Sequence, residues 1–144
     1  MALRVFLVED VLGTQALMKD LFSTVGGIEL VGTAQNEGEA KLWLDESPAP
    51  WDVAVLDLVL QAGSGFPVIT RCKERKPAGK VAIFSSYLTP TIGTHCLKLG
   101  ADVVFNKEDS EAFLAWLLRQ SLGATLEQSS NVSSEAGAGA SGGS

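Results

Sequence analysis

The sequence contains little cysteine and little positive charge, and it has no long apolar run. Its two cysteines, Cys72 and Cys96, form no CxxC motif, so we expect reduced thiols and neither a disulfide nor a metal site. The net charge is −6 at pH 7 and no basic cluster offsets it, which argues against direct binding of nucleic acid. No apolar stretch approaches the roughly 18 residues that a membrane span needs.

The first residues carry no targeting signal. Residues 1–4 lead directly into a strand-like run, without the apolar h-region and small-residue cleavage site of a signal peptide. We therefore expect a cytoplasmic protein that does not bind a membrane. A length of 144 residues, 46% of them apolar, suits one domain with its own core.

The composition changes near the end of the chain. Residues 127–144 are almost entirely Ser, Gly, Ala, Glu, Gln and Asn, with one valine. Such a segment buries too little apolar surface to offset the entropy lost on ordering. We expect an ordered domain over residues 1–122 and a disordered Ser/Gly/Ala-rich tail over residues 123–144, which is either native or an appended linker.

Short apolar runs alternate with segments of helical periodicity. The run at 52–58 is apolar on both faces, as in a strand buried within a parallel sheet. We expect strands at 3–8, 29–34, 52–58, 80–85 and 101–105, and helices at about 12–25, 36–45, 66–75, 89–100 and 109–122. In the first helix Leu17, Leu21 and Val25, with Met18 and Phe22 beside them, give an apolar stripe.

This alternation predicts an α/β fold, a single doubly wound sheet of five parallel strands with helices on both faces. Right-handed crossovers favour the flavodoxin-like strand order 2-1-3-4-5, a (βα)5 domain.

Polar residues stand where the expected strands end. Glu9 and Asp10 follow the first strand, Asp57 ends the third, Ser85 ends the fourth and Lys107 lies just past the fifth. The C-terminal ends of parallel strands share one edge, which is where open α/β folds bind ligands. Three carboxylates crowded there are unfavourable unless a proton or a cation resolves their repulsion.

Magnesium is the cation that suits this edge. It takes oxygen ligands, keeps several waters and pairs with phosphate substrates. A carboxylate, Mg²⁺, a lysine and a hydroxyl together suit in-line phosphoryl transfer onto the carboxylate, which gives an aspartyl phosphate. We therefore predict Mg²⁺ as the cofactor and Asp57 as the residue that carries the chemistry.

With these residues the sequence resembles the receiver domains of response regulators in two-component signalling, over about residues 3–122. Any one match is weak, whereas five in order after predicted strands form a specific signal. The matching residues are the Glu9-Asp10 pair in LVED, Asp57 in VLDL, Gly65 as the loop glycine, Ser85 ending VAIFS and Lys107 after GADVVFN.

The resemblance implies a role for each residue at the metal. Asp57 would be the phosphoacceptor and a metal ligand. Asp10 would bind Mg²⁺ directly, and Glu9 mainly through water. The backbone carbonyl of Val59 would complete the protein ligands.

Ser85 would hydrogen-bond the phosphoryl group and Lys107 would pair with it. The family's aromatic switch residue usually stands three positions before the lysine. Here that position is Val104, with Phe105 next to it, so the chain departs from the family's pair of hydroxyl and aromatic.

Two bulky residues stand where this family often tunes the hydrolysis of its phosphate. Val59 and Tyr87 occupy these positions, and neither has a carboxylate or amide that would position a water. We therefore expect slow loss of the phosphoryl group.

The resemblance implies a free-standing, single-domain signalling switch and not an enzyme. The phosphoryl group would come from a histidine kinase or a histidine phosphotransfer protein. Because we expect no output domain after the last helix, an unidentified downstream protein would bind the face formed by the fourth helix, fifth strand and fifth helix.

Two other functional classes share part of this pattern. A phosphate-independent, receiver-like docking module is the alternative, and it gains support from the altered switch aromatic. A phosphatase of the haloacid-dehalogenase type needs a second aspartate two residues after the nucleophile. This chain has Val59 there, which argues against that class.

Overall fold

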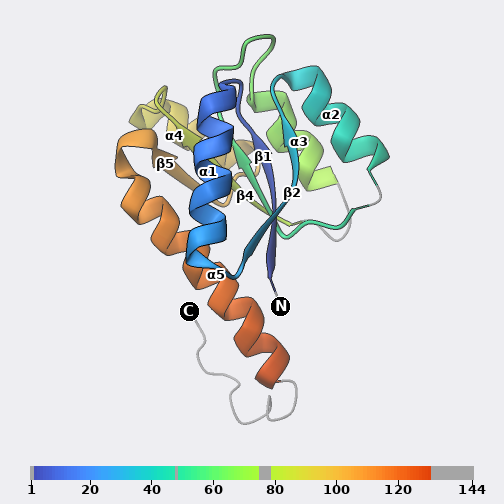
Figure 1. Cartoon of the computed structure of the whole chain (residues 1–144). Coiled ribbons are helices and arrows are strands. Elements are labelled where there is room, and N and C mark those ends of the chain that lie inside the picture. The colour runs from blue at the N-terminus through green and yellow to red at the C-terminus, as the bar shows by residue number, and fades with distance from the viewer. Residues whose placement is uncertain (1, 48, 75–78, 131–144) are drawn as a thin grey trace.

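The computed structural model describes residues 2–47, 49–74 and 79–130. Strands and helices alternate throughout, as the sequence predicts (Figure 1). In chain order the elements are β1 (Leu3–Val8), α1 (Leu12–Val25), β2 (Ile28–Ala34), α2 (Glu37–Glu46), β3 (Val53–Leu56), α3 (Phe66–Glu74), β4 (Lys80–Ser85), α4 (Pro90–Leu99), β5 (Val103–Asn106), a 3-10 turn (Lys107–Asp109) and α5 (Ser110–Ser130).

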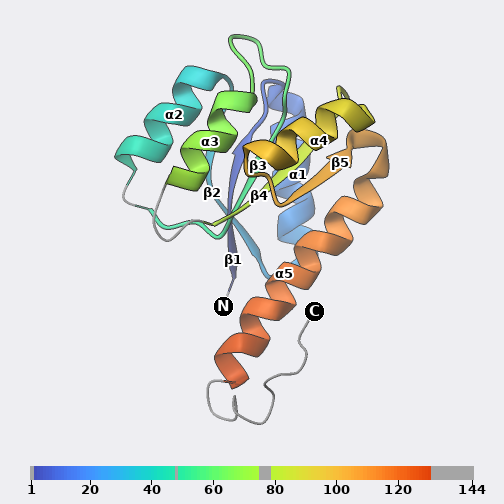
Figure 2. The same cartoon turned by 180° about the vertical axis from the view of Figure 1, so that it is seen from behind.

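The strands form one parallel sheet in the order β2-β1-β3-β4-β5, which confirms the predicted fold class. α1 and α5 cover one face of the sheet, and α2, α3 and α4 cover the other (Figures 1 and 2). The register aligns the ends of β1 and β3, since Val8 pairs with Leu56, and β4 ends at Ser85, just past the partner of Leu56, Ile83. The residues that follow these strands therefore share one edge.

The core lies in two layers, one on each side of the sheet. Toward α2, α3 and α4 it contains Phe6, Leu56, Ile69 and Ile83 among its fully buried residues. Toward α1 and α5 it contains Met18, Phe22, Phe113 and Leu117. β3 contributes to both layers, and all four of its residues are buried, as its apolar run on both faces predicts.

Only part of the predicted stripe of α1 is buried. Met18 and Phe22 are buried, whereas the side chain of Leu17 is 68% exposed and Leu21 and Val25 are also exposed. At 100° per residue Met18 lies about 100° and Phe22 about 140° around the helix from Leu17, and that side of α1 faces the sheet. The spacing was helical, but the stripe turned partly toward the surface.

Local signals place the helix starts well. The Asn36 side chain accepts a hydrogen bond from the Glu39 amide (2.8 Å), and the Glu39 carboxylate accepts one from the Gln35 amide (2.8 Å). This resembles the reciprocal capping box that the sequence predicts. Thr89 caps α4 with one hydrogen bond, which its Oγ1 accepts from the Ile92 amide (3.2 Å), and Pro90 lies in the first turn.

α5 continues through Ser130, past the predicted domain end at residue 122. The rest of the predicted tail, residues 131–144, lies outside the described residues, so the domain boundary stays a prediction. No helix in the described ranges is long and apolar enough to cross a membrane.

Replacing Phe22 with alanine should lower the free energy of unfolding by about 3–5 kcal/mol, because the truncation leaves a cavity in the α1 layer of the core. Leu17→Ala, on the exposed side of the same helix, should change it by no more than about 0.5 kcal/mol. Urea unfolding of both variants measures the difference. Equal losses would contradict the orientation of α1.

Candidate functional site

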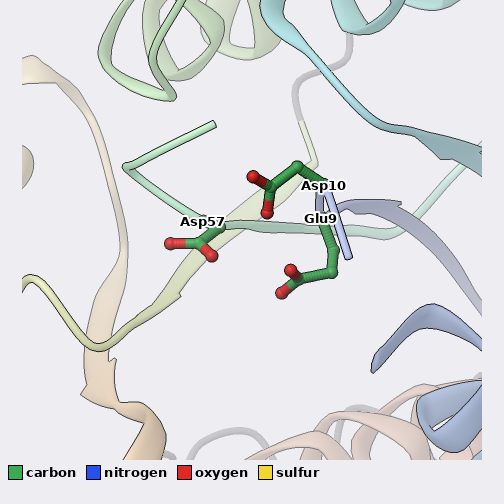
Figure 3. Close-up of side chains that lie close together, drawn as sticks. All are labelled: Glu9, Asp10 and Asp57. Atoms are coloured by element: carbon green, nitrogen blue, oxygen red, sulfur yellow. The ribbon is translucent and has the colours of Figure 1, made fainter. Parts of the chain in front are cut away.

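Three carboxylates meet at the C-terminal edge of β1 and β3. Glu9, Asp10 and Asp57 each place a carboxylate oxygen within 4.8 Å of the others (Figure 3). The sheet fixes their backbones, since the Glu9 amide donates to the Ala34 carbonyl (2.9 Å) and the Asp57 amide donates to the Val8 carbonyl (3.0 Å). Glu9 is 2% exposed and Asp57 7%, so both carboxylates are largely removed from water.

Asp57 is held at both carboxylate oxygens. Its Oδ1 accepts a hydrogen bond from the amide of Leu58 (2.7 Å) and a longer one from that of Val59 (3.4 Å). Its Oδ2 accepts one from Nζ of Lys107 (2.8 Å). The side chain is thus fixed in direction by the turn that follows β3 and by a lysine from the opposite side of the site.

Lys107 joins two acids that lie far apart in the sequence. Besides Asp57 it contacts Oε1 of Glu9 at 2.7 Å. Burial lowers the pKa of Lys107, but the hydrogen bonds to Asp57 and Glu9 outweigh it and the net effect is a raised pKa. Lys107 is therefore a firmly held cation.

Burial also raises the pKa of Glu9, which the hydrogen bonds from Lys107 and from the Val11 amide oppose. These two donors stabilise the charged form of the Glu9 carboxylate.

Asp10 differs from the other two acids. Its carboxylate accepts no hydrogen bond or ion pair from the described residues, although it lies beside the carboxylates of Glu9 and Asp57. One lysine faces three acids, so negative charge remains uncompensated. A set of oxygen donors with spare negative charge and an open ligand fits Mg²⁺.

Two glutamines that the sequence analysis did not single out hold the acidic pair from behind. Nε2 of Gln15 donates to the Glu9 carbonyl (2.7 Å) and, less closely, to that of Ala34 (3.3 Å). Nε2 of Gln35 donates to the Asp10 carbonyl (3.3 Å). Periodicity could not find them, because an amide on a helix or in a loop normally faces water.

An open pocket of about 350 Å³ lies next to Asp57, and Val59, Ser85, Ser86 and Tyr87 complete its lining. Ser85 is fully buried, and its Oγ accepts a hydrogen bond from the Tyr87 amide (3.1 Å). Its hydroxyl proton can still be donated into the pocket. Val59 and Tyr87, each 55% exposed, offer it no carboxylate or amide side chain.

Gly65 has a steric reason to be glycine. Its amide donates to the Leu58 carbonyl (3.0 Å), and a Cβ on it would overlap the carbonyl oxygen of Asp57. The loop after β3 therefore passes directly over the backbone of the acceptor candidate. The Gly65 carbonyl accepts hydrogen bonds from the amides of Val68 and Ile69, and these bonds begin α3.

The two neighbouring residues of β5 face opposite layers. Val104 packs on the α4 side, where a Cβ on Gly93 would lie 3.6 Å from Val104 Cγ2. Phe105 packs on the α5 side, with its ring centroid 5.8 Å from that of Phe113 and 6.2 Å from that of Trp116. Neither residue lines the pocket next to Asp57.

The structure thus brings together the acids and Lys107, and Ser85 lines the same pocket as Asp57, at the strand ends where the sequence predicts these residues. It places Val59 and Tyr87 at the pocket and Val104 and Phe105 away from it. The chemical roles of these residues stay predictions.

Comparison with known proteins assigns a family. The model of a family described as response regulator receiver domain matches residues 5–135. No match is found among curated proteins.

Solved structures share the fold at low sequence identity. The response regulator domain of Thermotoga maritima CheB is 20% identical, with a TM-score of 0.71 over 85% of this chain and 98% of that one. A two-component response regulator of the LuxR family from Aurantimonas is 23% identical, with a TM-score of 0.67 over 82% of this chain and 86% of that one. A chain in the structure of a CheX–CheY–BeF3–Mg complex from Borrelia burgdorferi is 20% identical, with a TM-score of 0.66 over 72% of this chain and 77% of that one.

Gly65→Ala should lower the free energy of unfolding by about 1–3 kcal/mol, because the added methyl group forces the loop off the Asp57 carbonyl. Gly13→Ala is the matched control. It lies in α1 with open space around it and should stabilise the protein by up to about 1 kcal/mol. Urea unfolding compares the two, and a neutral Gly65→Ala would contradict the close approach.

Proposed function

Because the chain belongs to the response regulator receiver domain family, we propose that it is a phosphorylation-dependent signalling switch that accepts a phosphoryl group on Asp57. The observation that carries the proposal is the clamped carboxylate of Asp57, which borders an open pocket and contacts Lys107 beside two further acids. Of the three acids, Asp57 is the one that lines this pocket.

In the proposed step a carboxylate oxygen of Asp57 attacks the phosphorus of a donor, and the bond from phosphorus to the donor's leaving group breaks. Lys107 pairs with the transferred group and the Ser85 hydroxyl donates a hydrogen bond to a phosphoryl oxygen. Asp10, Asp57 and the Val59 carbonyl would hold Mg²⁺, with Glu9 bound through water. When bound, Mg²⁺ supplies positive charge that neutralises the phosphoryl oxygens.

The proposed donor is a histidine kinase or a histidine phosphotransfer protein, since phosphohistidine carries a labile phosphoryl group. The chain acts in stoichiometric proportion, as a carrier of a signal and not as an enzyme that turns over substrate. A cytoplasmic location is part of the proposal.

Output goes through a protein partner on the face of α4, β5 and α5. The related CheY of Borrelia burgdorferi is seen in complex with CheX together with BeF3 and Mg, which supports partner binding as the output of such domains. The net charge of −6 supports a protein and not a nucleic acid as the direct partner.

A phosphate-independent docking module is the second candidate. It is favoured by β5, where the family's aromatic position holds Val104 and where Phe105 is packed in the opposite layer. A domain that does not transmit phosphorylation could still present the same faces to a partner.

Incubation with acetyl phosphate and Mg²⁺ should add one phosphoryl group to the intact protein, as measured by mass spectrometry. Asp57→Ala and pretreatment with EDTA should each abolish the gain, because they remove the acceptor and the metal. Asp20→Ala, an exposed acid on α1, is the matched control and should keep the gain. A gain retained in Asp57→Ala would contradict the assignment, and no gain at all would favour the docking module.

The phosphoryl group should be lost slowly, because the bulky rim residues position no water. Val59→Asn should speed autodephosphorylation by about tenfold, which corresponds to about 1.4 kcal/mol of activation free energy. Leu42→Asn, a similarly exposed apolar residue on α2, should leave the rate unchanged. The decay of the phosphorylated mass gives the rates, and an unchanged rate in Val59→Asn would show that water is not limiting.

A further inference from the structure

The hydroxyl of Ser85 has two tasks in the proposed function. In the structure its oxygen accepts the amide hydrogen of Tyr87 at 3.1 Å. A phosphoryl group on Asp57 would accept a hydrogen bond from the same hydroxyl in the pocket that both residues line. Ser85 is fully buried at the end of β4. If its oxygen moves toward that group, the Tyr87 amide must either move with it or lose the hydrogen bond.

Tyr87 is placed to respond to such a change. It lines the pocket together with Asp57 and Ser85, yet 55% of it is exposed. A ring that belongs to no core cluster can change position without opening a cavity.

The residues after Tyr87 lead directly to α4. Leu88 is half-buried in the α4 layer of the core, where a Cβ on Gly93 would lie 3.7 Å from its Cδ1. Thr89 then caps the helix through the Ile92 amide. In α4 only Gly93 and Cys96 are buried, both small, while Ile92 and Leu99 pack partly exposed against the core.

β5 offers no comparable aromatic. Val104 carries no ring, and Phe105 is packed between Phe113 and Trp116 in the opposite layer. A ring fixed there cannot reach the pocket of Asp57 without leaving the core.

We propose that Tyr87 is the positioning residue through which this chain reports its phosphorylation, with the Ser85 hydroxyl as the link from Asp57 and the β4–α4 loop as the route to α4. The inference rests on the proposed function. It assigns the transmission of the phosphorylation signal to a residue that follows β4 and not to one in β5.

Fluorine NMR tests the first step, because Tyr87 is the only tyrosine of the chain. Protein labelled with 3-fluorotyrosine is treated with acetyl phosphate and Mg²⁺, and its phosphorylated fraction is read by intact mass. A second resonance should appear with that same fraction. In Ser85→Ala, compared at equal phosphorylated fraction, the resonance should stay at its original position.

Three outcomes would overturn the inference, and mass separates them. Phosphorylated protein with an unchanged resonance refutes the role of Tyr87 and leaves the proposed function standing. A shift that persists in phosphorylated Ser85→Ala refutes the link through the hydroxyl. Absence of any mass gain refutes the proposed function and the inference together.

Hydrogen exchange of α4 tests the second step. Phosphorylation should change exchange over Pro90–Leu99 in the parent protein, in Tyr87→Phe and in Val104→Ala. The change should be lost in Tyr87→Ala, because the ring is removed. A change that persists in Tyr87→Ala and disappears in Val104→Ala would show that β5, and not Tyr87, transmits phosphorylation to α4, and would overturn the proposal.

Discussion

The site depends on the ion pairs that the ammonium group of Lys107 makes with Glu9 and Asp57. This group lies between two carboxylates that are almost completely buried, at 2.7 Å from Glu9 and 2.8 Å from Asp57. Buried carboxylates of like charge are unfavourable next to one another, and removing such a partner leaves charge unpaired in a poorly solvated place. The fold can hold its acids close together because it also places Lys107 between two of them.

The sheet determines why these groups meet. β1 and β3 are neighbours in space, although α1, β2 and α2 separate them in the chain. Their parallel register brings the residues after Val8 and Leu56 to the same edge. The turn that follows β3 then orients Asp57 through two amides, while Gly65 lets the loop come back over its carbonyl. Rigid strands thus fix the acids, and loops form the rim of the pocket.

Much of the fold and of the site could be predicted from the sequence, because the signals were local. The two-faced run of β3, the caps at Asn36 and Thr89 and the polar residues after each strand each depend on a few neighbouring positions. Parallel pairing then turned a list of strand ends into one cluster.

What could not be predicted depends on three-dimensional packing. The sequence predicts the stripe of α1, but the rotation of the helix about its axis decides which part of the stripe meets the sheet. That part is Met18 and Phe22. The hydrogen bonds of Gln15 and Gln35 to the acidic pair depend on contacts between separate elements. The opposite facing of Val104 and Phe105 follows from strand alternation, but their packing partners do not.

The contact between Lys107 and Glu9 joins residues 98 positions apart. A contact of such separation closes a very large loop and cannot form until nearly the whole domain has been synthesised. A nascent chain therefore contains its acids long before it contains the lysine that balances them. Maturation of the site is coupled to completion of the fold, so chemical competence marks a chain that has finished folding.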